Sequence, residues 1–328
     1  MDEFDQMLES VSRTFALSIK NLPHKLQKPV GLAYLLFRVS DTIEDHPYLE
    51  ASRKIELLEL WADVLEGHRA SKSFVDSISD LDSSDSEVYV TQHADELMEY
   101  LYSLSPILQE MLTTRVKRST LGMARWQRQG PFVDTVEELD DYMHQVAGRV
   151  GYLMTDIYAW YSPSFAKQKD ELMPLSREIG LGLQTVNVIR GIPKDYERGW
   201  LFIPGTYLSQ EGLSRDQFFE PGNESRAINI VNKLADKADK HLSHGLTYIS
   251  AFPRYQHRVR LASIWPLFFA IKTLAISRDN IEVIRNEVKI TRADVKTIIR
   301  NTTMMGWSER WLKAYYDKLN QSPDLKAL

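Results

Sequence analysis

Apolar residues recur at three- and four-residue spacings along most of the chain, the pattern of helices that bury one face. Alternating runs of β-branched residues bounded by turn pairs are almost absent, so we expect an all-α fold. The spacing predicts helices over residues 29–46, 51–67, 89–103, 105–128, 136–160, 166–191, 211–218, 224–251, 257–277, 279–287, 292–301 and 304–319.

Two stretches interrupt this pattern. Residues 77–87 are rich in Ser and Asp but lack the spacing of a calcium-binding loop, so we predict a solvated loop there. Gly and Pro break the helical pattern over residues 199–213, where we expect a mobile flap. No repeat of fixed period and no linker divides the chain, so residues 1–328 are predicted to form a single domain.

Composition excludes several classes of function. The net charge is −5 with both signs mixed along the chain, which gives no general reason to expect nucleic acid or an anionic membrane as a partner. The absence of cysteine excludes disulfides, thiolate catalysis and sulfur-ligated metals. The acidic N-terminus does not resemble a secretory signal, and residues 261–277 include a proline and a lysine and are predicted to be a buried helix. We expect a cytoplasmic protein, with peripheral membrane contact as the alternative.

A first polar cluster lies in the predicted helix 29–46. Tyr34, Arg38, Asp41 and Asp45 follow one another at spacings of four, three and four and therefore share one helix face, with Glu44 beside them. Carboxylates within an apolar helix are unfavourable to bury unless a cation compensates them, and their oxygens suit magnesium that bridges a diphosphate. A solvated acidic face on a surface helix is the alternative interpretation.

A second polar stripe lies near residue 190. It comprises Gln184, Asn187, Gly191 and Asp195, at spacings of three, four and four. Asn and Asp oxygens are suitable magnesium ligands, while Arg190 and Lys194 could bind phosphate oxygens. Pro193 is expected to end or kink the helix and leave Asp195 at a helix-to-loop junction. The alternative is a helix C-terminus capped by ordinary cationic residues.

Small residues in a third motif indicate a close approach. Gly148 and Gly151 fall within one predicted helical turn, where each glycine costs roughly 1 kcal/mol relative to alanine. Close packing against another helix and approach to a ligand are both compatible with this pattern. Tyr142 and His144 lie one turn earlier, and we expect His144 to be structural. Aromatic residues such as Phe15 either line an apolar cavity that shelters a carbocation or belong to the core.

Four ordered motifs, Ser12–Ile19, Asp41–Asp45, Tyr142–Gly151 and Leu183–Asp195, together resemble the squalene/phytoene synthase family, and most of all its squalene synthases. The resemblance spans nearly the whole chain. It implies a single-domain isoprenoid synthase fold of helices packed around a central cavity, with the two polar stripes facing each other across it.

The resemblance also implies roles for individual residues. Those implied to bind magnesium are Asp41, Glu44, Asp45, Asn187 and Asp195. Those implied to contact substrate phosphates are Ser12, Arg13, Tyr34, Arg38 and Arg190, with Phe15, Gln184 and Lys194 as further substrate-binding residues. Tyr34, Arg38 and Tyr142 are implied to be catalytic, Tyr142 through proton removal. Lys289, together with Arg190, is implied to bind NADPH.

The chain departs from the family pattern at two positions of the second stripe. Gly191 stands where the family has an aspartate, and Lys194 replaces an acidic residue. Fewer magnesium ions, a shell completed by water, or compensation by Lys194 are each compatible with this change. A threonine, Thr291, also stands where the family has a basic residue near the cofactor.

The resemblance implies head-to-head condensation of two farnesyl diphosphates, through presqualene diphosphate, to squalene with magnesium and NADPH. One alternative is an enzyme of the same fold that makes presqualene diphosphate, hydroxysqualene, dehydrosqualene or phytoene without reductant. Another is a protein that binds or hydrolyses a prenyl diphosphate without coupling, because Gly191 removes a metal ligand. In each case the expected partner is a small prenyl diphosphate.

Overall fold

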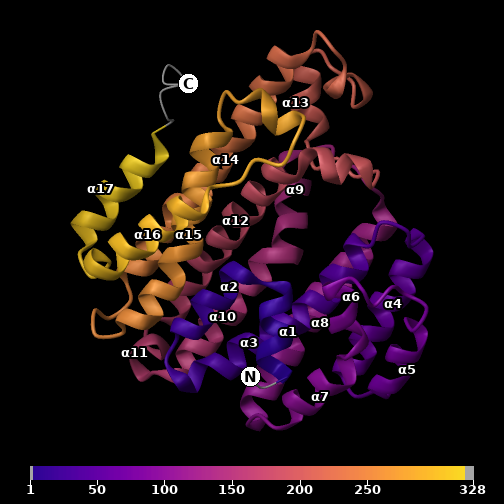
Figure 1. Cartoon of the computed structure of the whole chain (residues 1–328), viewed down its shortest axis with the longest axis vertical. Helices are drawn as coiled ribbons and strands as arrows, with labels where there is room; N and C mark the ends of the chain where they lie inside the picture. Colours follow the sequence, from indigo (N-terminus) through magenta and orange to yellow (C-terminus); the bar gives the residue numbers. More distant parts are fainter. Residues whose placement is uncertain (1–2, 322–328) are drawn as a thin grey trace. The chain divides into compact units, whose positions relative to one another are not determined.

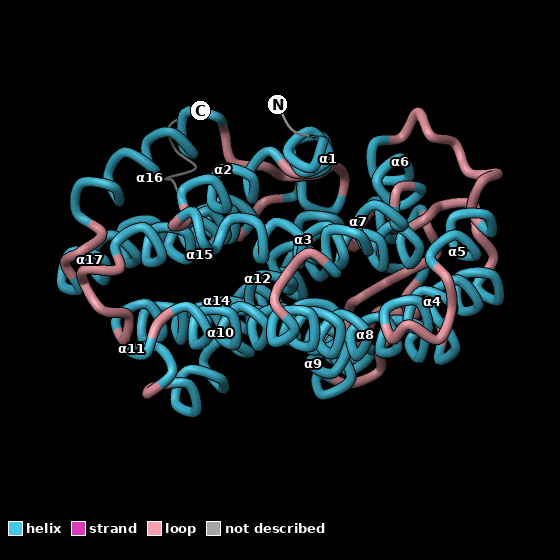
Figure 2. The backbone as a smooth tube through the Cα atoms, turned by 90° about the horizontal axis from the view of Figure 1, so that it is seen from below, coloured by secondary structure: helices cyan, strands magenta, loops and turns pink. Residues whose placement is uncertain are grey.

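Helices account for the regular structure of residues 3–321, the part of the chain that the computed structural model describes; the side chains of residues 13 and 14 lie outside that part. Over this range Figure 2 shows helices and loops without a strand, and an isolated parallel bridge joins Phe132 to Leu201. The predicted all-α class is therefore confirmed.

The chain divides into two units, of residues 1–130 with 149–173 (unit 1) and residues 131–148 with 174–328 (unit 2). The helices of unit 1 are α1 (Glu3–Val11), α2 (Arg13–Asn21), α3 (His24–Asp45), α4 (Ala51–Leu65), α5 (Ser71–Ser77), α6 (Ser86–Gln92), α7 (Ala94–Tyr102), α8 (Pro106–Gln129), α10 (Arg149–Tyr161) and α11 (Pro163–Ala166). The single domain predicted from sequence stays a prediction.

In unit 1, α3 is the central element and contacts α1, α2, α4, α6, α7, α8 and α10. Its buried residues occupy nearly every turn, and Leu26, Leu32 and Leu35 are fully enclosed. Burial of a leucine side chain stabilises a fold by about 1.5–3 kcal/mol, so this helix is held on several sides. The polar residues of the first motif are thus presented from a rigid support.

In unit 2 the regular elements are α9 (Val136–Met143), the π-helical turn η1 (His144–Gly148), α12 (Lys169–Glu197, which begins in unit 1), α13 (Gly205–Gln210), η2 (Asp216–Phe219), α14 (Glu224–Ser250), α15 (His257–Ser277), η3 (Ile281–Ile284), α16 (Arg292–Met305) and α17 (Glu309–Asn320). Figure 1 shows α14 and α16 beside α15, and α17 also contacts α15. This helix has the length and apolar character of a membrane span, but 78% of its most apolar window is buried inside the protein. It therefore forms the core of unit 2, as its apolar composition predicts.

A polar network joins α9, α12 and α14 inside unit 2. His241 Nδ1 lies 2.6 Å from Glu178 Oε2, and its Nε2 lies 2.8 Å from Lys237 Nζ. Lys237 also donates a hydrogen bond to Asp140. Burial alone would raise the pKa of Asp140, but hydrogen bonds from His241 and Lys237 outweigh that effect and lower it.

Several predicted boundaries are wrong for identifiable reasons. The helix predicted over residues 211–218 is displaced: α13 begins after Pro204 and ends before Gly212, whose φ of 66° stops it. Residues 279–287 contain only the short turn η3, and residues 136–160 are interrupted by η1. The two N-terminal helices were not predicted, because nine-residue helices depend on packing more than on propensity.

Candidate functional site

The first polar motif lies along α3. The Tyr34 hydroxyl donates to the carbonyl of Val11 at 3.1 Å and accepts from Arg38 Nη2 at 2.8 Å, and the Arg38 guanidinium lies 5.4 Å from the centre of the Tyr34 ring. Phe15 also packs against this tyrosine, with ring centres 5.7 Å apart. The predicted face of α3 is therefore assembled, and it fixes the direction of the Arg38 side chain.

Glu87 of α6 completes this cluster, although no pattern in the sequence indicated its role. Its carboxylate lies 3.2 Å from Arg38 Nη1, whereas Asp41 lies 4.0 Å from the same atom. Asp85 caps α6 by accepting from the backbone N–H groups of Glu87 and Val88, which sets the position of the helix start. Arg38 is thus held between two carboxylates from different helices.

The carboxyl group of Asp41 has a pKa raised to about 7. Burial is the largest cause; the Arg38 charge opposes it, and the charges of Asp45 and Glu87 reinforce it. Solvent still reaches part of this side chain, which is 34% exposed. Carboxylates that raise one another's pKa are the arrangement that a bound divalent cation stabilises, so this donor set fits magnesium.

Glu44 does not lie in the same environment as its neighbours. It is buried, whereas Asp45 is exposed, and Lys54 Nζ donates to its backbone carbonyl at 2.7 Å. The reason is its position on α3. Residue 44 lies one position away from the Asp41–Asp45 stripe, so its side chain turns toward the core. The three predicted carboxylates therefore do not converge, and Glu44 as a magnesium ligand stays a prediction.

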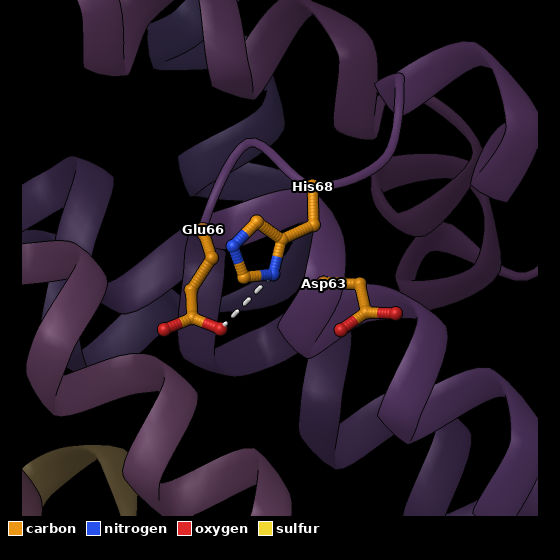
Figure 3. Close-up of side chains that lie close together, drawn as sticks. All are labelled: Asp63, Glu66 and His68. Carbon is orange, nitrogen blue, oxygen red and sulfur yellow. Dashed lines mark ion pairs between the residues drawn. The ribbon is translucent and has the colours of Figure 1, made fainter.

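Asp63, Glu66 and His68 are, among residues 3–321, the one group of three acidic or histidine side chains whose ligand atoms lie within 4.8 Å of one another (Figure 3). All three are exposed at the end of α4. Glu66 already forms an ion pair with Lys117, and that hydrogen bond lowers its pKa. The cluster is accounted for without a metal.

At the N-terminus, Ser12 acts as the N-cap of α2. Its hydroxyl oxygen accepts from the backbone N–H of Phe15 at 3.1 Å, and its side chain is buried. Phe15 itself is exposed. Arg13, predicted to contact phosphate, has its side chain outside the described residues. Substrate contacts by these residues stay predictions.

The second polar stripe lies on α12. Asn187 Nδ2 donates to Gln184 Oε1 at 3.2 Å, as expected for residues one turn apart. Arg190 and Lys289 both bind Glu287, at 3.1 Å and 2.6 Å. The two cations that the resemblance assigns to phosphate or cofactor are thus brought to one carboxylate, which sequence spacing could not indicate.

The helix does not end at Pro193, because α12 continues to Glu197, and the kink predicted as the other possibility stays a prediction. The missing proline N–H is tolerated in the last turns, where Arg198 N and Trp200 N donate to the carbonyl of Asp195 at 3.1 and 2.8 Å. The Asp195 side chain accepts from Arg198, so its charge is compensated. Lys194 is exposed.

Gly191 lies one turn before Asp195 and leaves room for a side chain. A Cβ atom at this position would lie 3.5 Å from Asp195 Oδ2, an ordinary van der Waals contact. Compared with the aspartate that the family resemblance implies at this position, glycine therefore removes a charge without filling its space. Gly191 carries no charge, and the ion pair with Arg198 compensates the charge of Asp195. The stripe is therefore less negative than the α3 cluster.

Tyr142 lies in an aromatic cluster. It is buried and stacks on Phe202, with ring centres 4.3 Å apart, while Trp200 lies 6.5 Å away and 5.3 Å from Phe202. The faces of such rings attract cations. Trp200 and Phe202 follow α12 and were not predicted, although two aromatic residues just after a polar stripe are a recognisable signal.

Glycine permits close helix packing beside the third motif. A Cβ on Gly180 of α12 would lie 2.5 Å from the Ala147 carbonyl oxygen, closer than real Cβ atoms approach, so glycine is required at this crossing. A Cβ on Gly148 would lie 2.5 Å from His144 Nδ1 in the preceding turn and 3.1 Å from Leu181 Cδ1 of α12, so a side chain there would displace the His144 ring. The π-helical turn η1 occurs here, beside Tyr142, and such turns are frequent at functional sites.

Comparisons with known proteins agree with this arrangement. A family model for squalene/phytoene synthases matches residues 8–294. Squalene synthase ERG9 of Saccharomyces cerevisiae is 30% identical over 313 residues, which cover 93% of this chain and 68% of that protein. Squalene synthase ERG9 of Gibberella zeae is 28% identical over 310 residues, with 92% and 64% covered. The chain thus spans about two thirds of the length of these relatives.

Solved structures show the fold. A complex of TcSQS with the ligand BPH1237 superimposes with a TM-score of 0.81 at 23% identity and covers 96% of this chain and 90% of that one. A dehydrosqualene synthase bound to a ligand has a TM-score of 0.64 at 14% identity, with 96% and 95% covered. The predicted isoprenoid synthase fold is therefore confirmed.

Proposed function

Because the chain belongs to the squalene/phytoene synthase family, we propose that it is a prenyltransferase that condenses two farnesyl diphosphates head to head, through presqualene diphosphate, to squalene. The proposed reaction depends on magnesium and uses NADPH as the reductant. The main support is the α3 cluster, in which Arg38 contacts Tyr34 and Glu87 and lies beside Asp41, whose pKa is raised.

The α3 cluster is suited to bind one diphosphate. The Arg38 guanidinium can donate to phosphate oxygens, and the Tyr34 hydroxyl, whose proton is directed to the Val11 carbonyl, orients it through a hydrogen bond of 2.8 Å. Asp41 and Asp45 would hold magnesium, which neutralises a diphosphate and makes it a better leaving group. The packing of Tyr34 against Phe15 keeps the donors in a fixed orientation.

The α12 stripe would bind the other diphosphate with more help from side-chain cations. Arg190, Lys194 and Lys289 provide positive charge, and Asn187 and Asp195 provide oxygen ligands. Tyr142, stacked on Phe202, would stabilise positive charge on the prenyl chain and assist proton removal. Arg190 and Lys289, aligned by Glu287, are also the candidates for the NADPH phosphates.

The threonine at position 291 has a structural explanation. Its hydroxyl accepts from the backbone N–H of Asp294 at 3.1 Å, and the Asp294 carboxylate accepts from the backbone N–H of Thr291 at 2.9 Å. This capping box begins α16 and requires a short hydroxyl side chain. The missing basic residue is therefore compatible with cofactor binding through Lys289.

A second candidate function is supported by Gly191. With one carboxylate fewer and Asp195 paired to Arg198, the α12 stripe offers less to a metal ion. An enzyme of the same fold that stops at presqualene diphosphate, or releases hydroxysqualene, dehydrosqualene or phytoene, would need no reductant. A protein that only binds or hydrolyses a prenyl diphosphate is the limiting case.

Incubation of the purified chain with farnesyl diphosphate and magnesium, with and without NADPH, tests these alternatives when the lipid extract is identified by mass spectrometry. We expect squalene only when NADPH is present. A thirty-carbon diphosphate, alcohol or polyene that forms without NADPH would favour the second candidate. Farnesol without any coupled product would refute coupling and support the limiting case.

A further inference from the structure

Two turns of unit 2 form a corner that the proposed reaction does not use. The α14–α15 turn, residues 251–256, and the α16–α17 turn, residues 306–308, lie next to each other. His257 Nε2 lies 3.2 Å from the Thr303 carbonyl oxygen, and Arg254 lies 3.6 Å from Glu309. We refer to these two turns with their flanking residues as the corner.

Arg260 holds the corner together from inside. Its side chain is fully buried, and Nη1 donates to the carbonyls of Ile249 and Phe252 at 2.8 and 2.7 Å. Nε and Nη2 point to the Gly306 carbonyl oxygen at 3.4 Å. The guanidinium thus lies at the C-terminal ends of two helices, α14 and α16, where a positive charge is favourable. Both turns are fixed by one residue.

The surface of the corner carries large apolar and aromatic side chains. Tyr255 is 76% exposed, Met304 59% and Trp307 49%. The indole N–H of Trp307 donates to the Met304 carbonyl at 3.1 Å, so the ring is oriented and its polar atom is satisfied. Exposed Tyr and Trp on a rigid support are typical of side chains that lie at the interface between lipid and water.

Positive charge surrounds these side chains. In residues 251–258 and 304–313, which are the two turns with their flanks, four residues are Lys or Arg and one is acidic, although the whole chain has a net charge of −5. Arg258 and Arg310 are exposed at the corner, and Glu309 is paired with Arg254. This local excess is complementary to anionic lipid, which attracts clustered Lys and Arg.

Hollows flank the corner on α17. One, of about 410 Å³, is bordered by Leu246, Glu309, Arg310 and Lys313, and the other, of about 360 Å³, by Met304, Trp311 and Lys318. Both are lined by apolar and basic side chains, and the acidic residue of the first, Glu309, is paired with Arg254, so they suit a lipid headgroup and the first carbons of its acyl chains. Since the apolar side chains stand on two turn tips rather than along a groove, a bilayer surface fits them better than a helix of another protein.

We propose that this corner docks the protein onto an anionic lipid bilayer, with Tyr255, Met304 and Trp307 entering the interface and the surrounding basic residues binding lipid headgroups. The docking is peripheral, because α15 beneath the corner is buried in the protein. A bilayer held here would be a source of amphiphilic prenyl diphosphates and a destination for an apolar product.

Co-sedimentation of the full chain with vesicles tests the proposal independently of enzymatic activity. Vesicles of phosphatidylcholine alone are compared with vesicles that also contain phosphatidylserine, at low and high salt. We expect binding to the anionic vesicles that weakens at high salt. The double variant M304S/W307S should bind about tenfold more weakly, since apolar surface is lost. R310E should bind up to about fivefold more weakly, since the charge that would contact a lipid headgroup is reversed.

Matched controls lie in unit 1. Tyr48, which is 88% exposed, is changed to serine, and the exposed Arg69 to glutamate; both variants should bind like the original chain. Circular dichroism verifies that each variant is folded. The proposal is overturned if the chain does not bind anionic vesicles, or if the control variants lose as much binding as the corner variants. It is also overturned if M304S/W307S changes the oligomeric state without lipid, which would make the corner a protein interface.

Discussion

Restoring a carboxylate at position 191 tests whether the α12 stripe has been adapted to fewer metal ions. In Gly191→Asp the new side chain would start 3.5 Å from Asp195 Oδ2, so the two carboxylates would lie about 4 Å apart. Two charges at that distance repel each other by about 1 kcal/mol in water and about 4 kcal/mol near a protein surface. Because Arg198 already compensates Asp195, we expect a loss of about 1–2 kcal/mol.

The matched control is Gly191→Asn, which has the same shape without the charge. Both variants gain the small helix-forming advantage over glycine, so their difference isolates the charge. Urea unfolding in EDTA should show the Asp variant to be about 1–2 kcal/mol less stable than the Asn variant. Added magnesium should remove most of this difference, and the Asp variant should reach half-maximal activity at less magnesium.

Equal stability of the two variants in EDTA would show that the carboxylates do not interact. A difference that magnesium leaves unchanged would show that the stripe does not bind the ion. The first outcome would refute the predicted repulsion at position 191, and the second would refute the proposal that Asn187 and Asp195 hold magnesium.

Three further predictions concern other positions. Asp45→Asn should lower the turnover number at least ~100-fold, since it removes a proposed metal ligand; near-normal turnover would refute the assignment of the α3 cluster. Glu287→Gln should raise the KM for NADPH about tenfold with little change in kcat, because Lys289 loses its ion pair with Glu287. Lys289→Gln is the comparison variant. A fall in kcat with no change in KM, in both variants, would contradict a positioning role for Glu287. Asp140→Asn should lower the free energy of unfolding by about 1–2 kcal/mol at pH 7. Since the pKa of Asp140 is lowered in the folded state, the carboxylate stabilises the fold at pH values above the ordinary carboxyl range, and this stabilisation is lost as the pH falls through that range. The free energies of unfolding of the variant and of the original chain should therefore become equal in acid. A difference in urea unfolding that does not change with pH would contradict the interaction with His241 as the cause.

The amino-acid sequence determined the features that depend on local spacing. The helix predicted over residues 257–277 is observed with the same bounds. The four-residue spacing of Tyr34 and Arg38 placed them in contact, as did the three-residue spacing of Gln184 and Asn187. Helix geometry makes such neighbours meet whatever the rest of the fold does. The family resemblance extended this to the fold, which the solved structures confirm.

Tertiary packing decided which side chains complete each cluster. Glu87 reaches Arg38 across 49 positions of the sequence, and Glu287 joins Arg190 to Lys289 from beyond α13, α14 and α15. It also buried Glu44 while leaving Asp45 exposed, although both lie in the same helical turn. A repeat of three or four residues identifies a helix face but not the element that covers it. Partners distant in the sequence are fixed only when the helices pack together, and they set the charge and burial of every group in the candidate site.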